Sequence, residues 1–210
     1  MTATKKVAIV APSPVPYTVG GAEKLWWGLL DAFKQHTDYE VELIKVPSPE
    51  RNFREIIDSY YYFSKLDLNH FDLVISTKYP AWMTWHENHW VYLQHRLRGL
   101  YDTYPADMPL EPFAGEGEAW PDELARLREL LVLQPHVDHR DELFSVVGNL
   151  KAELPALQWD SWFALPSPLA RKVTRWLDDS ALAPGMIKKY MAISQTVAKR
   201  GGYFPRDVPV

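Results

Sequence analysis

The chain contains no cysteine among its 210 residues. This absence excludes disulfide bonds, thiolate zinc sites and a cysteine nucleophile. Long apolar runs are absent as well, since none approaches the roughly 20 residues that a membrane-spanning helix needs. No secretory signal peptide precedes the first predicted strand. We therefore expect a cytoplasmic protein.

An excess of positive charge is also lacking. Lys and Arg total 23 and Asp and Glu total 27, which gives a formal net charge of -4. Proteins that bind nucleic acid through its phosphates are normally basic, so we expect no nucleic-acid partner. Aromatic residues, by contrast, are plentiful, with 9 Trp, 11 Tyr and 8 Phe. They suit core packing or ring-shaped ligands.

Hydrophobic patterning predicts alternating strands and helices. Short β-branched runs are typical of buried parallel strands, and apolar residues at helical spacing predict the segments between them. We expect strands at 6–11, 39–46, 71–76, 90–94 and 190–193, and helices at 22–33 and 53–66. This order predicts an α/β fold with a Rossmann-like, doubly wound parallel sheet.

The alternation is interrupted between about residues 103 and 185. The stretch 103–121 is rich in Pro, Gly and acidic residues, which favours a loop. Helices are expected at 122–133, 140–154, 168–177 and 195–203, the last with Ser194 as its N-cap. The prediction is a single Rossmann-like domain over 1–210 that carries a loop and helical insertion.

The segment Gly20-Gly21-Ala22-Glu23 stands between the first strand and the first helix. Glycine lets a ligand approach the backbone closely, and a helix N-terminus offers unpaired N–H groups. Together these features suit a phosphate or diphosphate, although the glycines could also serve only to form the turn. The dinucleotide fingerprint and the P-loop motif are both missing, which argues against an ATPase or a simple NAD enzyme.

Several segments in this order resemble family 4 glycosyltransferases. These are GT-B enzymes, in which two Rossmann-like domains face each other across a cleft. The similar segments are Lys6-Val7-Ala8-Ile9-Val10 with Gly20-Gly21-Ala22-Glu23, Phe71-Asp72-Leu73-Val74-Ile75-Ser76, Trp90-Val91-Tyr92-Leu93-Gln94-His95 with Arg96 to Asp102, and Tyr190-Met191-Ala192-Ile193-Ser194 with Gln195 to Arg200.

The resemblance implies that the chain is the N-terminal, acceptor-side half of such an enzyme. A C-terminal domain, absent from these residues, would bind the nucleotide diphosphate sugar. The whole enzyme would move a hexose to a saccharide or lipid-linked acceptor with retention, as in polysaccharide biosynthesis. It would use no metal and no cofactor beyond the sugar nucleotide. We expect the isolated 210-residue chain to be inactive.

The resemblance also implies site residues. Gly20 and Gly21 would approach the donor diphosphate. His95 would be the catalytic residue, close to the transferred sugar and donating a hydrogen bond to a hydroxyl or phosphate. The structural alternative for His95 is a histidine that caps a strand end and bonds to backbone.

Arg96, Arg98 and Tyr79 are candidates for acceptor binding. The two arginines could bind an acceptor phosphate. Charged residues usually lie on the surface in ion pairs, so pairing with Asp102 or Glu87 is the alternative that we place first.

Two other polar motifs do not support a site. The histidines of His86-Glu87-Asn88-His89 are three apart, whereas the zinc motif H-E-x-x-H needs four. We therefore expect no metal. The acidic residues of the predicted loop, Glu111, Glu116 and Glu118, lack the rigid support that a glycosidase pair requires.

The predicted helix 168–177 carries Arg171, Lys172 and Arg175 beside Trp176. It could form a peripheral contact with the inner face of a membrane, or it could simply be a solvated helix face. A different class of function also stays open. The domain could be a non-catalytic Rossmann-like binding or interaction module, because a fold does not fix a function.

Overall fold

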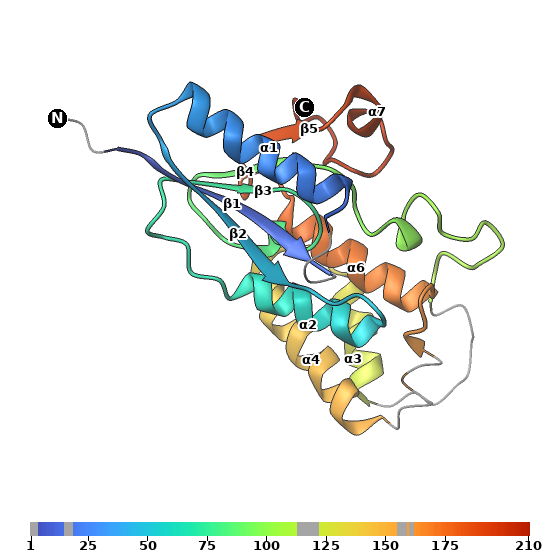
Figure 1. Cartoon of the computed structure of the whole chain (residues 1–210). Helices are drawn as coiled ribbons and strands as arrows, with labels where there is room; N and C mark the ends of the chain where they lie inside the picture. Colours follow the sequence, from blue (N-terminus) through green and yellow to red (C-terminus); the bar gives the residue numbers. More distant parts are fainter. Residues whose placement is uncertain (1–3, 15–18, 113–121, 155–158, 160–161) are drawn as a thin grey trace.

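A sheet of five parallel strands, in the order β2-β1-β3-β4-β5, forms the centre of the molecule (Figure 1). This is a computed structural model, and it describes residues 4–14, 19–112, 122–154, 159 and 162–210. The strands are β1 (Lys6–Ser13), β2 (Glu40–Pro47), β3 (Leu73–Ser76), β4 (His89–Leu93) and β5 (Lys189–Ala192). The parallel α/β sheet expected from the sequence is confirmed.

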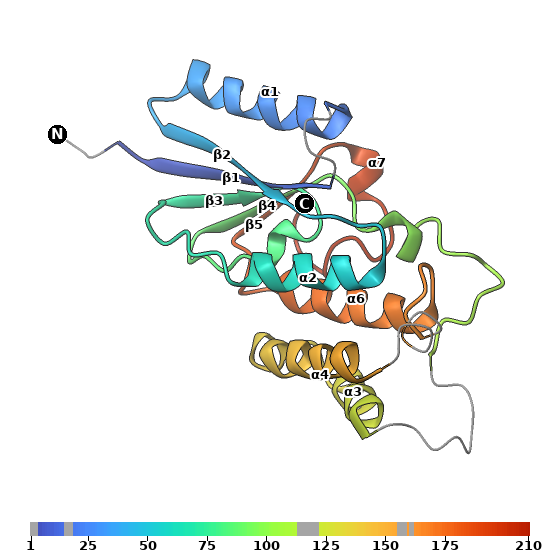
Figure 2. The same cartoon turned by 60° about the horizontal axis from the view of Figure 1, so that its bottom comes forward.

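Helices cover both faces of this sheet. Figure 2 shows α1 on one side, α2 and α6 on the other, and α3 and α4 beyond them as an outer layer. The helices are α1 (Gly21–His36), α2 (Phe53–Ser64), α3 (Asp122–Val132), α4 (Arg140–Glu153), α6 (Pro168–Ala181) and α7 (Gln195–Ala198), with short 3-10 turns η1 (Ala81–Met83), η2 (Arg98–Leu100) and η3 (Val137–His139). Among the described residues, no helix has both the length and the apolar character needed to cross a membrane.

Capping residues explain where the helices begin. The Ser167 hydroxyl accepts a hydrogen bond from the Ala170 N–H, and Pro168 occupies the first helical position of α6. Asn52 caps α2 in the same way, by accepting from the Glu55 N–H. Each cap satisfies an N–H group that the helix itself cannot pair.

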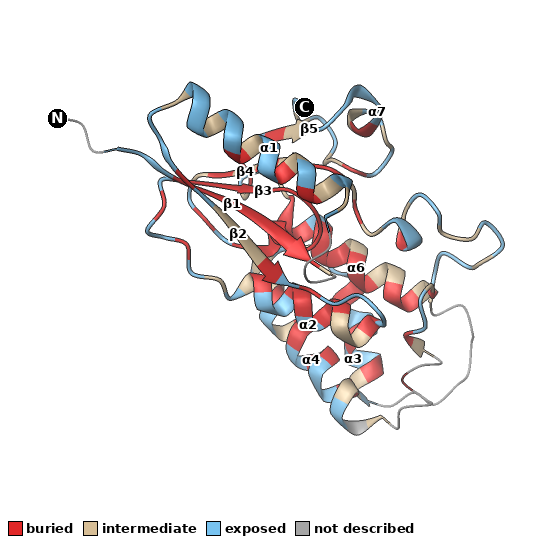
Figure 3. Cartoon of the chain, viewed as in Figure 1, coloured by how far each residue is buried: buried red, intermediate tan, exposed pale blue. Residues whose placement is uncertain are grey.

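Alternate residues of the strands pack into two hydrophobic cores, one on each face of the sheet. Val7 and Ile9 of β1 pack with Leu30 on the α1 side, whereas Ala8 and Val10 join the larger core shared with α2 and α6. This division follows from the period of two in a strand. Every residue of β1 after Lys6 is buried, as the continuous red of that strand in Figure 3 shows. Burial on both faces is what a near-continuous apolar run predicts.

Several helix boundaries differ from the expectation, and the two largest differences are at the ends of α6 and α7. The helix predicted to reach residue 177 continues to Ala181, because Asp178 and Ala181 also face the interior. The helix predicted over 195–203 ends at Ala198. It is followed by a turn in which Gly202 has φ +72°, a conformation that suits glycine. Within the expected insertion, α6 lies against the central layer as part of the connection from β4 to β5.

One buried carboxylate joins these layers. Asp178 of α6 is 0% exposed. It accepts hydrogen bonds from the Tyr60 hydroxyl at 2.7 Å, the Trp82 indole at 2.8 Å and the Tyr101 hydroxyl at 2.7 Å. Arg96 supplies the positive charge, 3.8 Å away. Because these partners come from α2, η1 and the segment after β4, Asp178 ties α6 to the rest of the fold.

We predict that Asp178→Asn destabilises the protein by roughly 1–3 kcal/mol, because one of the buried groups that donate to Asp178 loses its acceptor. The side-chain NH2 group of asparagine replaces one carboxylate oxygen. A hydroxyl that donated to that oxygen would then face another donor. Arg96 keeps its ion pair with Asp179. Urea unfolding measures the difference. Asp141→Asn is the matched control, because it breaks an exposed ion pair with Lys65 and should lose less than about 1 kcal/mol. Equal losses in the two variants would contradict the prediction.

A second prediction concerns pH. His89 is buried beside Ser76, with its Nε2 2.8 Å from the hydroxyl, and burial lowers its pKa to about 3. The unfolded chain takes up this proton below about pH 6.5, whereas the folded chain does not until about pH 3. Stability is therefore fully present above the unfolded pKa and is lost as pH falls through that window, by up to about 1.4 kcal/mol per pH unit.

His89→Gln should remove this dependence. Urea unfolding at about pH 7 and about pH 5 should show a decrease in stability that is smaller in the variant than in the wild type by up to about 2 kcal/mol. Taking the difference between the two proteins cancels the contribution of the other titrating groups. Parallel pH dependences would show that His89 is not responsible.

Candidate functional site

The chain reverses its direction of travel across the sheet between β1 and β3. From β1 it moves outward to β2, and from there it crosses back to β3 and continues to β4 and β5. Such a reversal opens a crevice at the carboxyl ends of the two strands, where α/β proteins bind ligands. Gly20 and Glu23 lie at the start of α1, Lys78 and Tyr79 follow β3, His95 follows β4 and Glu50 follows β2. We call these six residues the switch-point cluster.

The side chain of Glu23 covers one side of the start of α1. The Gly20 N–H donates to Oε2 of Glu23 at 2.9 Å, and Glu23 is buried. A Cβ added at Gly20 would lie 3.1 Å from that oxygen, whereas one added at Gly21 would meet no atom of the described residues within 4 Å. Gly20 therefore makes room for Glu23. Gly21 leaves the first turn of the helix open to a ligand.

Lys78 is the unusual group of the cluster. The residue is 7% exposed. Its ammonium lies 5.0 Å from the centre of the Tyr79 ring and has no hydrogen bond or ion pair with any residue that the structure describes. Burial lowers its pKa, and the negative charges of Glu50 and Glu23 act in the opposite direction. A buried cation that lacks a hydrogen-bonded or ionic partner among the described residues is expensive for the fold, which is typical of groups kept for a ligand.

Tyr79 holds Glu50 in position. The Tyr79 hydroxyl donates a short hydrogen bond to the Glu50 carboxylate. Burial and this neighbouring carboxylate raise the pKa of Tyr79 well above its ordinary range, so the hydroxyl stays a donor. Sequence reasoning placed Tyr79 at the acceptor. In the structure its hydroxyl is engaged, and Glu50 is the more accessible partner for a ligand.

His95 lies between charges of both signs. Its Nδ1 is 2.9 Å from the Arg96 carbonyl oxygen, and a carbonyl only accepts, so Nδ1 carries the hydrogen. Burial lowers the pKa of His95, and Lys78 and Arg98 lower it further. The ring is therefore neutral near pH 7 and presents Nε2 as a hydrogen-bond acceptor. This polarity is the opposite of the donor role that we expected.

The two arginines expected at the acceptor diverge. Arg96 is 1% exposed and donates to the Tyr203 carbonyl at 3.1 and 3.0 Å and to Asp179 at 3.1 Å. These bonds give it a structural role. Arg98 is exposed and pairs with Asp102 at 3.4 Å, which is the ion pair that the sequence favoured.

Sequence reasoning missed Lys78, Glu50 and Gln94. Gln94 follows β4 directly and is 4% exposed, yet its side-chain oxygen and nitrogen have no partner among the described residues. The available signal was positional. Polar residues that come straight after an apolar parallel strand, as in Ser76-Thr77-Lys78 and Leu93-Gln94, lie at the edge where ligands bind.

The cluster is suited chemically to hydroxyl groups. It holds one ammonium and two carboxylates, and His95 is neutral, so its formal charge is -1. The carboxylates and Nε2 of His95 only accept hydrogen bonds, and the ammonium only donates. A hydroxyl can do both, and a polyhydroxylated ring could satisfy several of these groups at once. An anion placed between Glu23 and Glu50 would meet repulsion from both carboxylates.

The remaining sequence candidates have local explanations. His86 bonds to the Phe71 carbonyl at 3.0 Å and accepts from the Asn88 N–H at 3.0 Å, and within the described ranges no group of three His, Cys, Asp or Glu could hold a metal ion. Glu111 pairs with Lys172 at 3.2 Å. Glu116 and Glu118 lie outside the described residues.

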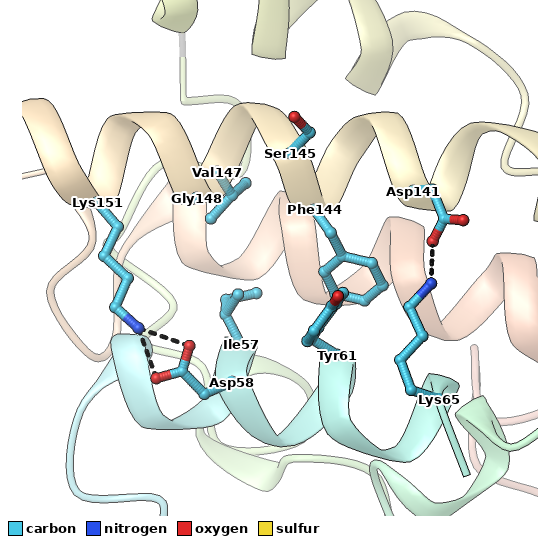
Figure 4. A pocket seen from close by; sticks show the side chains of 10 residues that line it. All are labelled: Ile57, Asp58, Tyr61, Lys65, Asp141, Phe144, Ser145, Val147, Gly148 and Lys151. Atoms are coloured by element: carbon cyan, nitrogen blue, oxygen red, sulfur yellow. Dashed lines mark hydrogen bonds and ion pairs between the residues drawn. The ribbon is translucent and has the colours of Figure 1, made fainter. Parts of the chain in front are cut away.

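A larger groove of about 570 Å³ lies elsewhere, between α2 and α4 (Figure 4). Its floor includes Phe144, and an ion pair stands at each end, Lys151 with Asp58 and Lys65 with Asp141. Because these charges already have partners and no residue of the switch-point cluster lines the groove, we do not regard it as the site.

Comparisons with protein-family models, with curated proteins and with solved structures find no match to this chain.

We predict that Lys78→Met does not destabilise the protein. The lowered pKa of Lys78 means that the folded state disfavours the ammonium relative to water, and methionine keeps much of the volume of the stem. The free energy of unfolding in urea should be unchanged or higher by up to about 1 kcal/mol. The exposed Lys24→Met is the control, with an expected change within about 0.5 kcal/mol. A clear loss of stability in the Lys78 variant would make the ammonium a structural group.

Proposed function

We propose that this chain is the acceptor-side domain of a glycosyltransferase. The enzyme would move a hexose from a nucleotide diphosphate sugar to a hydroxyl of a saccharide or lipid-linked acceptor, with retention, and without a metal. The observation that carries the proposal is the switch-point cluster, in which a neutral histidine, a buried ammonium and two carboxylates meet at the carboxyl edge of the sheet. Among the described residues that ammonium has no hydrogen bond or ion pair. The resemblance to family 4 glycosyltransferases supplies the type of reaction.

Each group has a role in this proposal. The carboxylates of Glu50 and Glu23 accept hydrogen bonds from sugar hydroxyls, and Lys78 donates to them. Nε2 of His95 accepts from a hydroxyl beside the reacting carbon, which holds the ring in a fixed orientation.

The start of α1 would serve the leaving group. When the bond to the anomeric carbon breaks, its electron pair stays with the diphosphate, which gains negative charge. The unpaired N–H groups of the first turn of α1, left open at Gly21, would offset that charge. A second, donor-binding domain would hold the nucleotide.

The test has two arms. In the first, a glycan array probed with the chain itself should detect saccharide binding that Lys78→Met weakens by roughly 10-fold, the loss of one charge-assisted hydrogen bond. In the second, the chain joined to a donor-binding domain is incubated with a panel of nucleotide sugars and saccharide acceptors. Release of nucleoside diphosphate is the readout.

His95→Ala should lower the rate of release by roughly 100-fold, as expected for loss of a hydrogen bond needed in the transition state. His36→Ala, at the exposed end of α1, should leave it unchanged. Release that is insensitive to His95 would remove this residue from the site. Saccharide binding without release from any nucleotide sugar would instead identify a non-catalytic binding module.

A further inference from the structure

A second hollow, of about 330 Å³, lies next to the segment that follows β4. Three arginines from three separate segments line it, Arg98, Arg175 and Arg200. Arg98 follows β4, Arg175 comes from α6, and Arg200 follows α7. We call this hollow the arginine pocket.

The pocket has an excess of positive charge. The only acidic residue among its lining residues is Asp102, so three guanidinium groups face one carboxylate and the formal charge is +2. This stands out in a chain of net charge -4. Asp102 pairs with Arg200 at 2.8 Å and with Arg98 at 3.4 Å. Arg175 has no ion pair with any described residue.

Two of the three arginines, Arg175 and Arg200, are held in place by aromatic rings before any ligand arrives. The guanidinium of Arg175 lies 4.8 Å from the centre of the Tyr101 ring, and that of Arg200 lies 5.3 Å from the Tyr203 ring. A Cβ added at Gly202 would lie 3.1 Å from Nη2 of Arg175, so the bare backbone there makes room for this group. Arginines fixed by aromatic rings lose little further freedom when they bind a ligand.

The arginine pocket and the switch-point cluster share the segment that follows β4. Arg98 stands three residues after His95, and its positive charge is felt at the His95 ring. A ligand with hydroxyl groups at one end and an anionic group at the other could therefore contact both. The formal charge is -1 at the switch-point cluster and +2 at the arginine pocket. The anionic end of such a ligand would therefore favour the pocket.

A purely structural role accounts poorly for this arrangement. Asp102 needs one arginine to neutralise it, and Arg200 already bonds to it at 2.8 Å. The charge of Arg175 then serves no carboxylate in the part of the chain that the structure describes. Three convergent guanidinium groups match the several oxygens and the charge of a phosphate, to which arginine binds through paired hydrogen bonds.

We propose that the arginine pocket binds the phosphate or diphosphate group of a ligand whose hydroxyl-bearing part lies at the switch-point cluster. The identity of that second part, an acceptor saccharide, rests on the proposed function. Anion binding by the pocket does not. A soluble sugar phosphate and a lipid phosphate share this chemistry.

Isothermal titration of the whole chain with inorganic pyrophosphate, and separately with a hexose 1-phosphate, tests the proposal. Arg175→Gln should weaken the binding of both by roughly 10-fold, the loss of one charge-assisted contact. Arg126→Gln is the matched control, because Arg126 is an exposed arginine of α3 paired with Glu142, and it should bind like the wild type. If Arg175→Gln fails to fold, the exposed Arg98→Gln replaces it.

Vesicles of phosphatidylcholine with and without phosphatidic acid separate the two sources of phosphate. Arg175-dependent binding to the acidic vesicles that exceeds binding to hexose 1-phosphate supports the pocket and identifies a lipid phosphate. The reverse order supports it and identifies a soluble one. Absence of binding to all three probes, or binding that Arg175→Gln and Arg98→Gln leave unchanged, overturns the proposal. Failure of sugar transfer with anion binding intact would remove only the proposed function.

Discussion

The carboxylate of Asp178 is the contact on which the rest of this structure depends. It is fully buried and collects donors from α2, η1 and the segment after β4. Arg96, its buried counter-charge, also holds the Tyr203 carbonyl near the end of the chain. A buried ion pair of this kind adds little net stability over apolar packing, but it penalises every arrangement that breaks it. It therefore selects one position for α6 and for the residues on either side of Arg96.

Those flanking residues are the ones to which we assign function. With Arg96 anchored in the interior, His95 lies at the switch-point cluster and Arg98 at the arginine pocket. Tyr101 belongs to the same network, and the guanidinium of Arg175 lies over its ring. Rigid support of this sort is what a binding or catalytic group requires, because small displacements weaken hydrogen bonds and charge pairs steeply.

The polarity of the site comes from burial. Desolvation lowers the pKa values of both Lys78 and His95, yet their surroundings differ. Lys78 has two carboxylates that favour its cationic form. At His95 burial is the main cause of the lowered pKa, and the charges of Lys78 and Glu50 oppose each other, so the ring stays neutral. The cluster thus contains both a donor and an acceptor, and a hydroxyl group can bind to each of them. The fold alone would not specify this, because Rossmann-like sheets serve many functions.

The sequence by itself determined the elements and their order. Apolar runs such as Val7-Ala8-Ile9-Val10, and caps such as Ser167 and Ser194, act over a few residues, and the strands, most helix boundaries and the carboxyl edge as the place of His95 follow from them. Only the tertiary structure decided that Arg96 faces inward and Arg98 outward, that Lys78 is buried with no ion pair to a described residue, and that Arg175 and Arg200 share a pocket. These outcomes depend on contacts such as that between Tyr60 and Asp178, 118 residues apart. No local pattern encodes them, because burial and charge pairing are set by whichever distant segments the packed layers bring together.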